Sequence, residues 1–255
     1  MKKKRIAGVI IVKNNIAVQS FSFKKYLPLG KPEHFVENLD RWNIDEIIVL
    51  DIDSSKLNAG PNFELIKRIA KLKIRTPLIY GGGIRNPEDA KKVIKSGADR
   101  LIIGSSFLQD FNLPLKISNV TGAQAVILSL PLIKFQKEFF IFNYILKKNI
   151  KINSEILNYI NSEYISELFL SDVLNDGKFN GFKPNIIKDL KRLTKNFPLL
   201  VFGGISDTTQ INKIAKFSNV SSICLGNFLN YHELNYQKYL KDLPKNKFRV
   251  SQFHK

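Results

Sequence analysis

The sequence contains one pattern twice, a short apolar run that ends in glycines. Leu78-Ile79-Tyr80-Gly81-Gly82-Gly83-Ile84 returns as Leu200-Val201-Phe202-Gly203-Gly204-Ile205, about 120 positions later. Two further pairs of segments stand at nearly the same separation, 46–51 with 167–172 and Ile103-Gly104 with Leu225-Gly226. Three matched strand ends at one spacing predict two homologous halves.

Short apolar runs rich in Ile, Val and Leu recur along the chain and suit strands that are buried on both faces. They lie at 5–12, 46–51, 77–80, 100–104, 124–130, 167–171, 199–202 and 221–225. Amphipathic segments with helix start and stop signals separate them: 32–42, 61–72, 87–95, 154–160, 185–193 and 207–217. This alternation predicts an α/β fold, a (β/α)8 TIM barrel with a half-barrel internal repeat.

Two extra segments interrupt the alternation, 16–30 after the first strand and 135–149 after the fifth. We predict that both form small hairpins at the carboxyl ends of the barrel strands. Since no linker composition is visible, residues 1–255 form one barrel domain in this interpretation. We expect residues 243–255 to form a flexible tail.

The formal charge of +18 is the outlier in an otherwise ordinary composition. Lysines spread among asparagines and isoleucines account for most of it, so codon bias explains the charge as well as a nucleic-acid partner does. We therefore expect no nucleic-acid partner. No apolar run approaches the length of a spanning helix, and the single cysteine, Cys224, excludes a disulfide framework. The sequence indicates a cytoplasmic protein with no membrane association.

Glycines after the strands are candidates for phosphate binding, because backbone N–H groups approach an anion closely where no side chain intervenes. One half of the chain offers Gly203, Gly204, Gly226 and Asn227; the other offers Gly82, Gly83, Gly104 and Ser105. Two such sites facing one mouth would suit an elongated ligand phosphorylated at both ends. The alternative is that these glycines only form tight turns into helices.

Asp51 and Asp176 follow strands two and six, and are the candidate catalytic carboxylates for acid–base chemistry. Each also has an ordinary structural interpretation, as a helix cap or a turn residue.

Charged residues open four strands at the opposite end of the barrel: Arg5, Glu46, Arg100 and Glu167. They predict either a salt-bridged plug that stabilises the barrel or a gate for a small polar molecule.

The order of the motifs resembles the HisF family, the cyclase subunits of imidazole glycerol phosphate synthase. It is carried by Lys4-Arg5-Ile6, Asp45-Glu46, Leu50-Asp51-Ile52-Asp53, Gly81-Gly82-Gly83-Ile84, Gly97-Ala98-Asp99-Arg100, Gln124-Ala125-Val126, Asn175-Asp176-Gly177, Gly181-Phe182 and Gly203-Gly204. The resemblance implies a lyase-type synthase subunit with two phosphate sites. It also implies a HisH-like glutaminase at the barrel bottom and an ammonia gate of Arg5, Glu46 and Glu167, with Arg100 in place of a lysine.

Three positions depart from the family pattern. The two catalytic aspartates of the family fall at Ile11 and Pro131, and a lysine of the first loop falls at Gln19. Each lost acid or base costs roughly 10² to 10⁴-fold in rate. The rim therefore lacks the expected pair for imidazole formation.

A branch of the family, the WbuZ/AglZ type, is associated with acetamidino modification of surface-polysaccharide sugars and also lacks the first aspartate. Its typical motifs resemble Pro61-Asn62-Phe63-Glu64-Leu65-Ile66 and Tyr80-Gly81-Gly82-Gly83-Ile84, although we would expect an aspartate at Pro131 there.

The main hypothesis is an ammonia-receiving barrel subunit with a phosphorylated small ligand and a sugar amidotransferase as a further partner. Two alternatives stay open, a histidine-pathway cyclase that uses Asp51 or Asp176, and a non-catalytic barrel that binds a phosphorylated ligand or nucleic acid. We expect neither a cofactor nor a metal.

Overall fold

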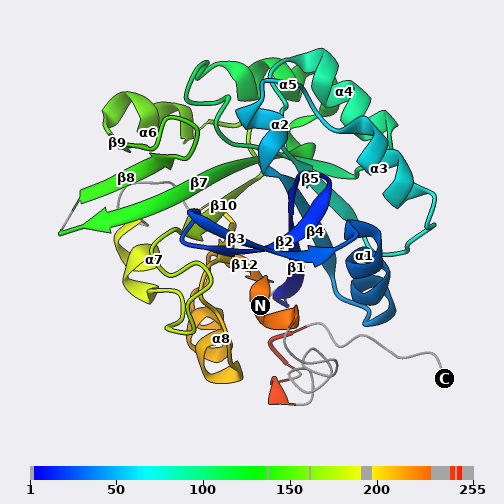
Figure 1. The fold of residues 1–255 in the computed structure, drawn as a ribbon. Helices are drawn as coiled ribbons and strands as arrows, with labels where there is room; N and C mark the ends of the chain where they lie inside the picture. The colour runs from blue at the N-terminus through cyan, green and yellow to red at the C-terminus, as the bar shows by residue number, and fades with distance from the viewer. Residues whose placement is uncertain are drawn as a thin grey trace.

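The computed structural model describes residues 3–136, 138–160, 162–190, 197–230, 242–244 and 246–248. Parallel strands form a closed barrel in chain order, because β7 pairs with β10 and β12 pairs with β1 (Figure 1). The barrel strands are β1 (Arg5–Lys13), β4 (Glu46–Asp51), β5 (Leu78–Gly81), β6 (Arg100–Ile103), β7 (Val126–Phe135), β10 (Glu167–Asp172), β11 (Leu199–Phe202) and β12 (Val220–Leu225). The predicted (β/α)8 barrel is confirmed.

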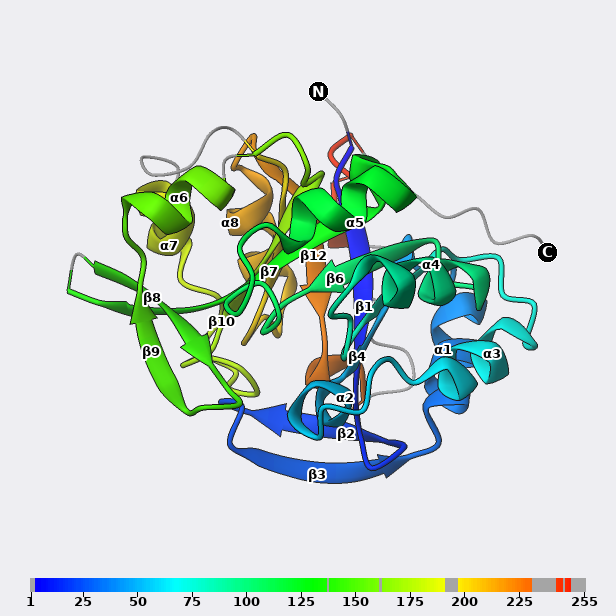
Figure 2. The same ribbon diagram turned by 90° about the horizontal axis from the view of Figure 1, so that it is seen from above.

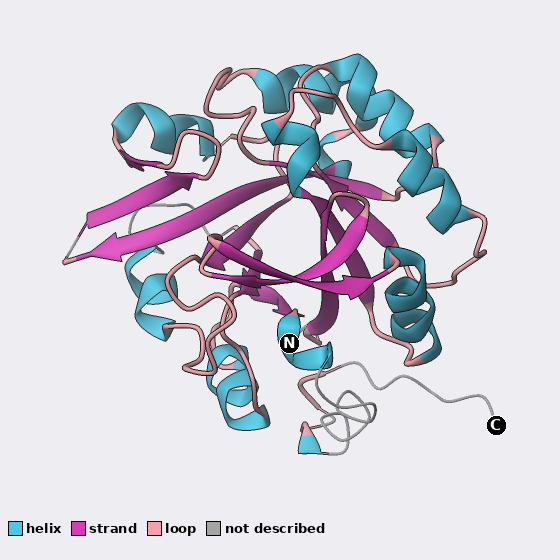
Figure 3. Cartoon of the chain, viewed as in Figure 1, coloured by secondary structure: helices cyan, strands magenta, loops and turns pink. Residues whose placement is uncertain are grey.

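Helices surround these strands and form an outer layer, as Figure 3 shows. They are α1 (Pro32–Arg41), α2 (Ile52–Lys56), α3 (Phe63–Ala70), α4 (Pro87–Lys95), α5 (Leu113–Thr121), α6 (Ser154–Ile160), α7 (Pro184–Leu190) and α8 (Thr208–Ala215). Each predicted helix lies within about two residues of its expected start, and residues 191–193 of the predicted fifth helix lie outside the described residues.

Both predicted hairpins are present. The first contains β2 (Ile16–Phe21) and β3 (Lys25–Gly30), and the second contains β8 (Glu138–Asn143) and β9 (Lys148–Lys151). Figure 2 places the β2–β3 hairpin at the end of the barrel opposite the N-terminus. This end, where the strands have their carboxyl ends, is called the rim below, and the end where the strands begin is called the bottom.

Equivalent elements of the two halves begin at one constant separation. Arg5 opens β1 and Val126 opens β7; Glu46 opens β4 and Glu167 opens β10; Leu78 opens β5 and Leu199 opens β11. The backbone repeats as well, because a side chain on Gly82 would meet the carbonyl oxygen of Asp51 at 2.2 Å. A Cβ added to Gly203 would likewise stand 2.8 Å from the carbonyl oxygen of Asp172. The half-barrel repeat therefore extends to the turns.

The core has two layers, one between the strands and the helices and one inside the barrel. The inner layer is apolar and includes Ala7, Val9, Ile48, Ile79, Ile127, Phe169, Leu200, Phe202 and Cys224. Cys224 is buried, and burial raises the pKa of its thiol. The thiol is therefore held neutral inside the barrel, as expected of a structural cysteine.

Three features differ from the sequence prediction. Helices α2 and α5 were not predicted, because α2 has only five residues and α5 carries Pro114 in its first turn and little amphipathic contrast. Within the segment expected to form a tail, Leu243 and Phe248 are buried; the remainder of 243–255 falls largely outside the described residues. No helix among the described segments is long and apolar enough to cross a membrane.

Candidate functional site

Four charged side chains meet at the bottom of the barrel and form a ring of ion pairs, called the bottom ring below. Arg5 pairs with Glu46 at 2.5 Å and also with Glu167, and Arg100 pairs with Glu167 at 2.5 Å and with Glu46 at 3.5 Å. Ser166 and Ser221 add hydrogen bonds to Arg100 and Glu167. The residues predicted from strand starts therefore lie together around the barrel axis.

Burial sets the protonation of the bottom ring. Burial alone would lower the pKa of Arg5, but the carboxylates of Glu46 and Glu167 outweigh it and raise that pKa. Burial raises the pKa of Glu46, whereas the two arginines hold the pKa of Glu167 below its usual value against the same penalty. The Oε2 atom of Glu46 is buried and has no hydrogen-bond partner among the described residues. Since Oε2 of Glu167 faces Arg100 in an ion pair, Oε2 of Glu46 is the carboxylate oxygen of the ring that has no partner among the described residues.

A hollow of about 920 Å³, including its open mouth, lies at the rim and is called the first hollow below. Gly82, Gly83, Gly104 and Ser105 all line it, so the predicted phosphate residues of the first half are brought together. The N–H of Gly83 donates to Ser55 Oγ at 2.9 Å. Among the described lining residues, Asp51 is the only one with a charged side chain.

Sequence reasoning missed two residues of this hollow, Ser55 and Tyr144. Tyr144 follows β8 on the second hairpin, and burial raises its pKa while contacts with Ser55 and Ser105 partly offset the rise. A neutral phenol therefore stands beside the glycine loop. A lone tyrosine in a hairpin carries no motif, so only the fold reveals its position.

The two departures from the family pattern, Ile11 and Pro131, line the first hollow. Ile11 lies on β1 beside Leu50, and Pro131 lies on β7 beside Ser171. Apolar side chains therefore occupy the part of the rim where the resemblance implies carboxylates.

Asp51 lies in the first hollow but has a structural task. Its Oδ1 accepts hydrogen bonds from the backbone N–H groups of Asp53 and Ser54, both at 3.2 Å, and so caps α2. Its Oδ2 accepts from Asn62 at 3.1 Å. The carboxylate is buried and fully engaged, as the helix-cap interpretation expects.

The motifs that carry the branch resemblance contact each other around Asp51. The Tyr80 hydroxyl accepts a hydrogen bond of 2.9 Å from the N–H of Asn62, and Asn62 caps α3 through Leu65. Burial raises the pKa of Tyr80 far above its usual value. The two motifs thus form one unit that holds the loop before α3 against β5.

A second, smaller hollow of about 320 Å³ contains the predicted phosphate residues of the second half, Gly203, Gly204, Gly226 and Asn227. The Asn227 side chain is already engaged, because it donates to the Ser20 carbonyl at 2.6 Å and accepts from the Ser20 N–H at 3.1 Å. Lys178 supplies a cation to this second hollow.

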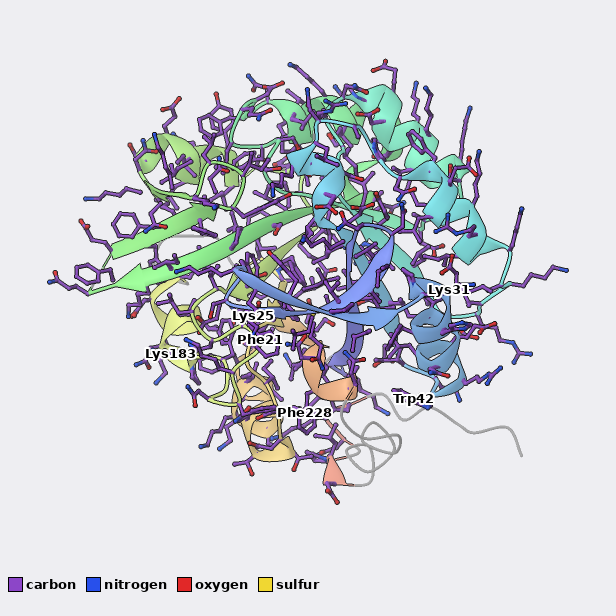
Figure 4. The ribbon with its side chains drawn as sticks, viewed as in Figure 1. Phe21, Lys25, Lys31, Trp42, Lys183 and Phe228 are labelled. Atoms are coloured by element: carbon purple, nitrogen blue, oxygen red, sulfur yellow. The ribbon has the colours of Figure 1, made fainter. Side chains whose placement is uncertain are left out.

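Asp176 lines the second hollow and is buried. Its carboxylate accepts from Ser20 Oγ at 2.6 Å and from the N–H of Phe23 at 3.4 Å, so it fastens the β2–β3 hairpin to the loop after β10. Burial and the nearby Asp172 raise the pKa of Asp176 to about 6. In the view of Figure 4, Phe21 and Lys25 of the hairpin lie on the same side as Lys183, and Lys31 and Trp42 lie on the other side.

The two candidate catalytic aspartates are not brought together, since Asp51 and Asp176 line different hollows. Within the described parts of the chain, no group of three or more His, Cys, Asp or Glu side chains could hold a metal ion.

A duplicated (β/α)8 barrel with a charged ring at its bottom and glycine-lined hollows at its rim defines the class of this protein. The family model of histidine biosynthesis proteins matches residues 5–235. The chain belongs to this family.

Individual relatives agree with this assignment. A Campylobacter jejuni protein provisionally named imidazole glycerol phosphate synthase subunit hisF2 is 31% identical over 209 residues, which cover 81% of this chain and 82% of that protein. A Vibrio vulnificus protein with the same provisional name is 28% identical over 91% of this chain and 85% of its own length. The imidazole glycerol phosphate synthase subunit HisF of Buchnera aphidicola is 27% identical, with 88% of each chain covered.

Proposed function

We propose that this chain is a HisF-like barrel subunit of a glutamine amidotransferase system and receives ammonia from a glutaminase bound at its bottom. The observation that carries the proposal is the contrast between a retained bottom ring and a rim without its carboxylate pair. Arg5, Glu46, Arg100 and Glu167 are held by mutual ion pairs, whereas Ile11 and Pro131 line the first hollow.

The barrel interior supports passage of a small neutral molecule. Directly above the bottom ring lie apolar side chains such as Ala7, Ile48 and Leu200. A charge pays a large desolvation penalty in such surroundings, whereas neutral ammonia does not. The free acceptor at Glu46 Oε2 offers a hydrogen-bond partner at the entrance.

The acceptor chemistry that we propose is acetamidino modification of surface-polysaccharide sugars, through a sugar amidotransferase that uses the ammonia. Its support is the contact between the Asn62 and Tyr80 motifs, together with the resemblance of these motifs to the WbuZ/AglZ-type branch. The glycine residues of the two hollows would bind the phosphate of the ligand.

The test is reconstitution with a HisH-like glutaminase from the same organism. We expect a stable complex and a several-fold rise in glutamate release, and Arg5→Met should lower the rise while Lys116→Met, an exposed control, leaves it unchanged. Absence of both complex and stimulation would overturn the proposal. Deletion of the gene should remove the acetamidino group from the polysaccharide without creating a histidine requirement.

A second candidate is the cyclase of histidine biosynthesis, favoured by Asp51 in the first hollow and by the names of the relatives. Turnover of the ribulosyl substrate with ammonium salts would establish it, and a deletion strain would then require histidine.

A further inference from the structure

The two glycine-lined hollows are lined by largely different residues. Gly82, Gly83, Gly104 and Ser105 line the first, and Gly203, Gly204, Gly226 and Asn227 line the second. Among the described residues, Phe202 is the only one that lines both. The Phe202 ring therefore borders both candidate phosphate sites.

Phe202 is held firmly in this position. It ends β11, points into the barrel, and is 4% exposed. Its ring stacks on Phe169, with the ring centroids 5.7 Å apart and an angle of 22° between the planes. On its other side it occupies the space above Gly226, where an added Cβ would stand 2.8 Å from the ring. The glycine predicted to bind phosphate thus also makes room for the aromatic ring.

A hydrogen bond closes the partition near the mouth. Ser20 lines the first hollow and Asp176 the second, and the Ser20 hydroxyl donates to the Asp176 carboxylate at 2.6 Å. The backbone of Ser20 is fixed on the same side by its two hydrogen bonds with Asn227. The partition therefore has an aromatic part inside the barrel and a polar part under the β2–β3 hairpin.

We propose that Phe202 is a specificity-determining residue that restricts the rim to ligands carrying one phosphate. This rests on the phosphate sites of the proposed function and specifies the ligand class. The first hollow pairs its glycine loop with apolar side chains such as Ile11 and Pro131 and offers no cationic side chain among its described lining residues. It suits a monophosphate ester of an uncharged sugar or nucleoside.

The experiment measures whether one ligand can reach both hollows. Inorganic phosphate, alkyl monophosphates and α,ω-alkanediol bisphosphates of increasing length are titrated by calorimetry into the wild-type chain and into Phe202→Ala. When two linked groups bind together, the affinity exceeds that of either group by about 10² to 10⁴-fold. For the wild type we expect each bisphosphate to bind within about twofold of the monophosphate of equal length.

In Phe202→Ala we expect at least one bisphosphate to gain about tenfold over its monophosphate, and the gain should grow in the double variant Phe202→Ala/Ser20→Ala. The control is Phe179→Ala, which removes an exposed aromatic ring of the second hollow and leaves the partition in place. Thermal unfolding checks that each variant folds, and Phe202→Leu replaces Phe202→Ala if it does not.

The outcomes separate the two proposals. A wild-type preference of tenfold or more for a bisphosphate, or no gain in either Phe202 variant, overturns the role of Phe202. A wild-type chain that binds neither inorganic phosphate nor any monophosphate overturns the phosphate sites of the proposed function themselves.

Discussion

The two ends of this barrel are built from the same strands but have opposite chemistry. At the bottom, Arg5, Glu46, Arg100 and Glu167 converge in one buried ring of ion pairs. At the rim, Asp51 is the one charged side chain among the described residues that line the first hollow. Its carboxylate caps helix α2. The bottom is organised for charge, and the first hollow for an uncharged ligand body.

The two ends are subject to different energetic constraints. A buried ring of charges must keep every member, because removal of one leaves another unpaired in a low-dielectric site. The rim can exchange a carboxylate for Ile11 or Pro131 without such a penalty, since no buried cation depends on it. Function at the rim can therefore change while the bottom stays fixed.

The largest expected effect comes from breaking the bottom ring. Arg5→Met removes the cation shared by Glu46 and Glu167 and should lower the free energy of unfolding by about 3–5 kcal/mol, measured by urea denaturation. Lys116→Met, which breaks the exposed pair with Asp110, should cost at most about 1 kcal/mol. Equal effects of the two changes would contradict the difference between buried and exposed charge.

The next largest effect is the pH dependence of stability that Asp176 gives to the rim. Burial raises the pKa of Asp176 in the folded chain to about 6, from the ordinary 3.8 of an aspartate. The proton on Asp176 therefore stabilises the fold below about pH 4, and this contribution is lost as the pH rises through about 6. Compared with Asp176→Asn, the wild type should lose roughly 2–3 kcal/mol of unfolding free energy between about pH 4 and 7.

Urea midpoints of both proteins across this range measure the difference, and the nearby Asp172 titrates in both. A difference that stays constant with pH would show that Asp176 is not titrating in this range.

A smaller effect is expected when alanine replaces equivalent glycines of the two hollows. Gly226→Ala drives a Cβ into the Phe202 ring at 2.8 Å and should cost about 1–3 kcal/mol. Gly104→Ala meets its nearest atom, Ser129 Cβ, at an ordinary 3.7 Å and should change stability by at most about 0.5 kcal/mol. In a Phe202→Ala background the cost of Gly226→Ala should fall by at least about 1 kcal/mol. An unchanged cost would show that the ring is not the obstacle.

The smallest effect tests the task of Asp51. Asp51→Ala removes the cap of α2 and should cost about 1 kcal/mol, whereas Asp51→Asn keeps a capping oxygen and should be nearly neutral. Neither change should alter stimulation of the glutaminase. Loss of stimulation in Asp51→Asn, with stability unchanged, would assign the carboxylate a chemical role.

The fold was predictable because continuous apolar runs and helix signals alternate with one period in both halves. The bottom ring was predictable for a related reason, since residues that open parallel strands lie in one layer of a barrel. Arg5, Glu46, Arg100 and Glu167 needed only their strand positions to be placed together. Helix α5 was not predicted, because its apolar residues are not confined to one face.

The rim was predictable only in part. Gly82 and Gly203 could be assigned to equivalent turns, but the sequence cannot show that the Phe202 ring separates the two hollows, because this depends on the direction of one side chain. The contact of Tyr144 with Ser55 joins residues far apart in the chain without a motif. Such features follow from side-chain packing rather than from periodicity.

Each of the two rim hairpins contacts the opposite half of the barrel. The β2–β3 hairpin of the first half rests on Asp176 and Gly177 of the second, and Tyr144 on the hairpin of the second half contacts Ser55 and Ser105 of the first. The first hollow is lined by both hairpins, by Ser20, Phe23 and Tyr26 of the first and by Phe142 and Tyr144 of the second. The first half standing alone would keep its glycine loop but lose the lining that the second hairpin supplies, so ligand binding in the first hollow is a property of the fused pair and would reappear in separated halves only when they reassociate.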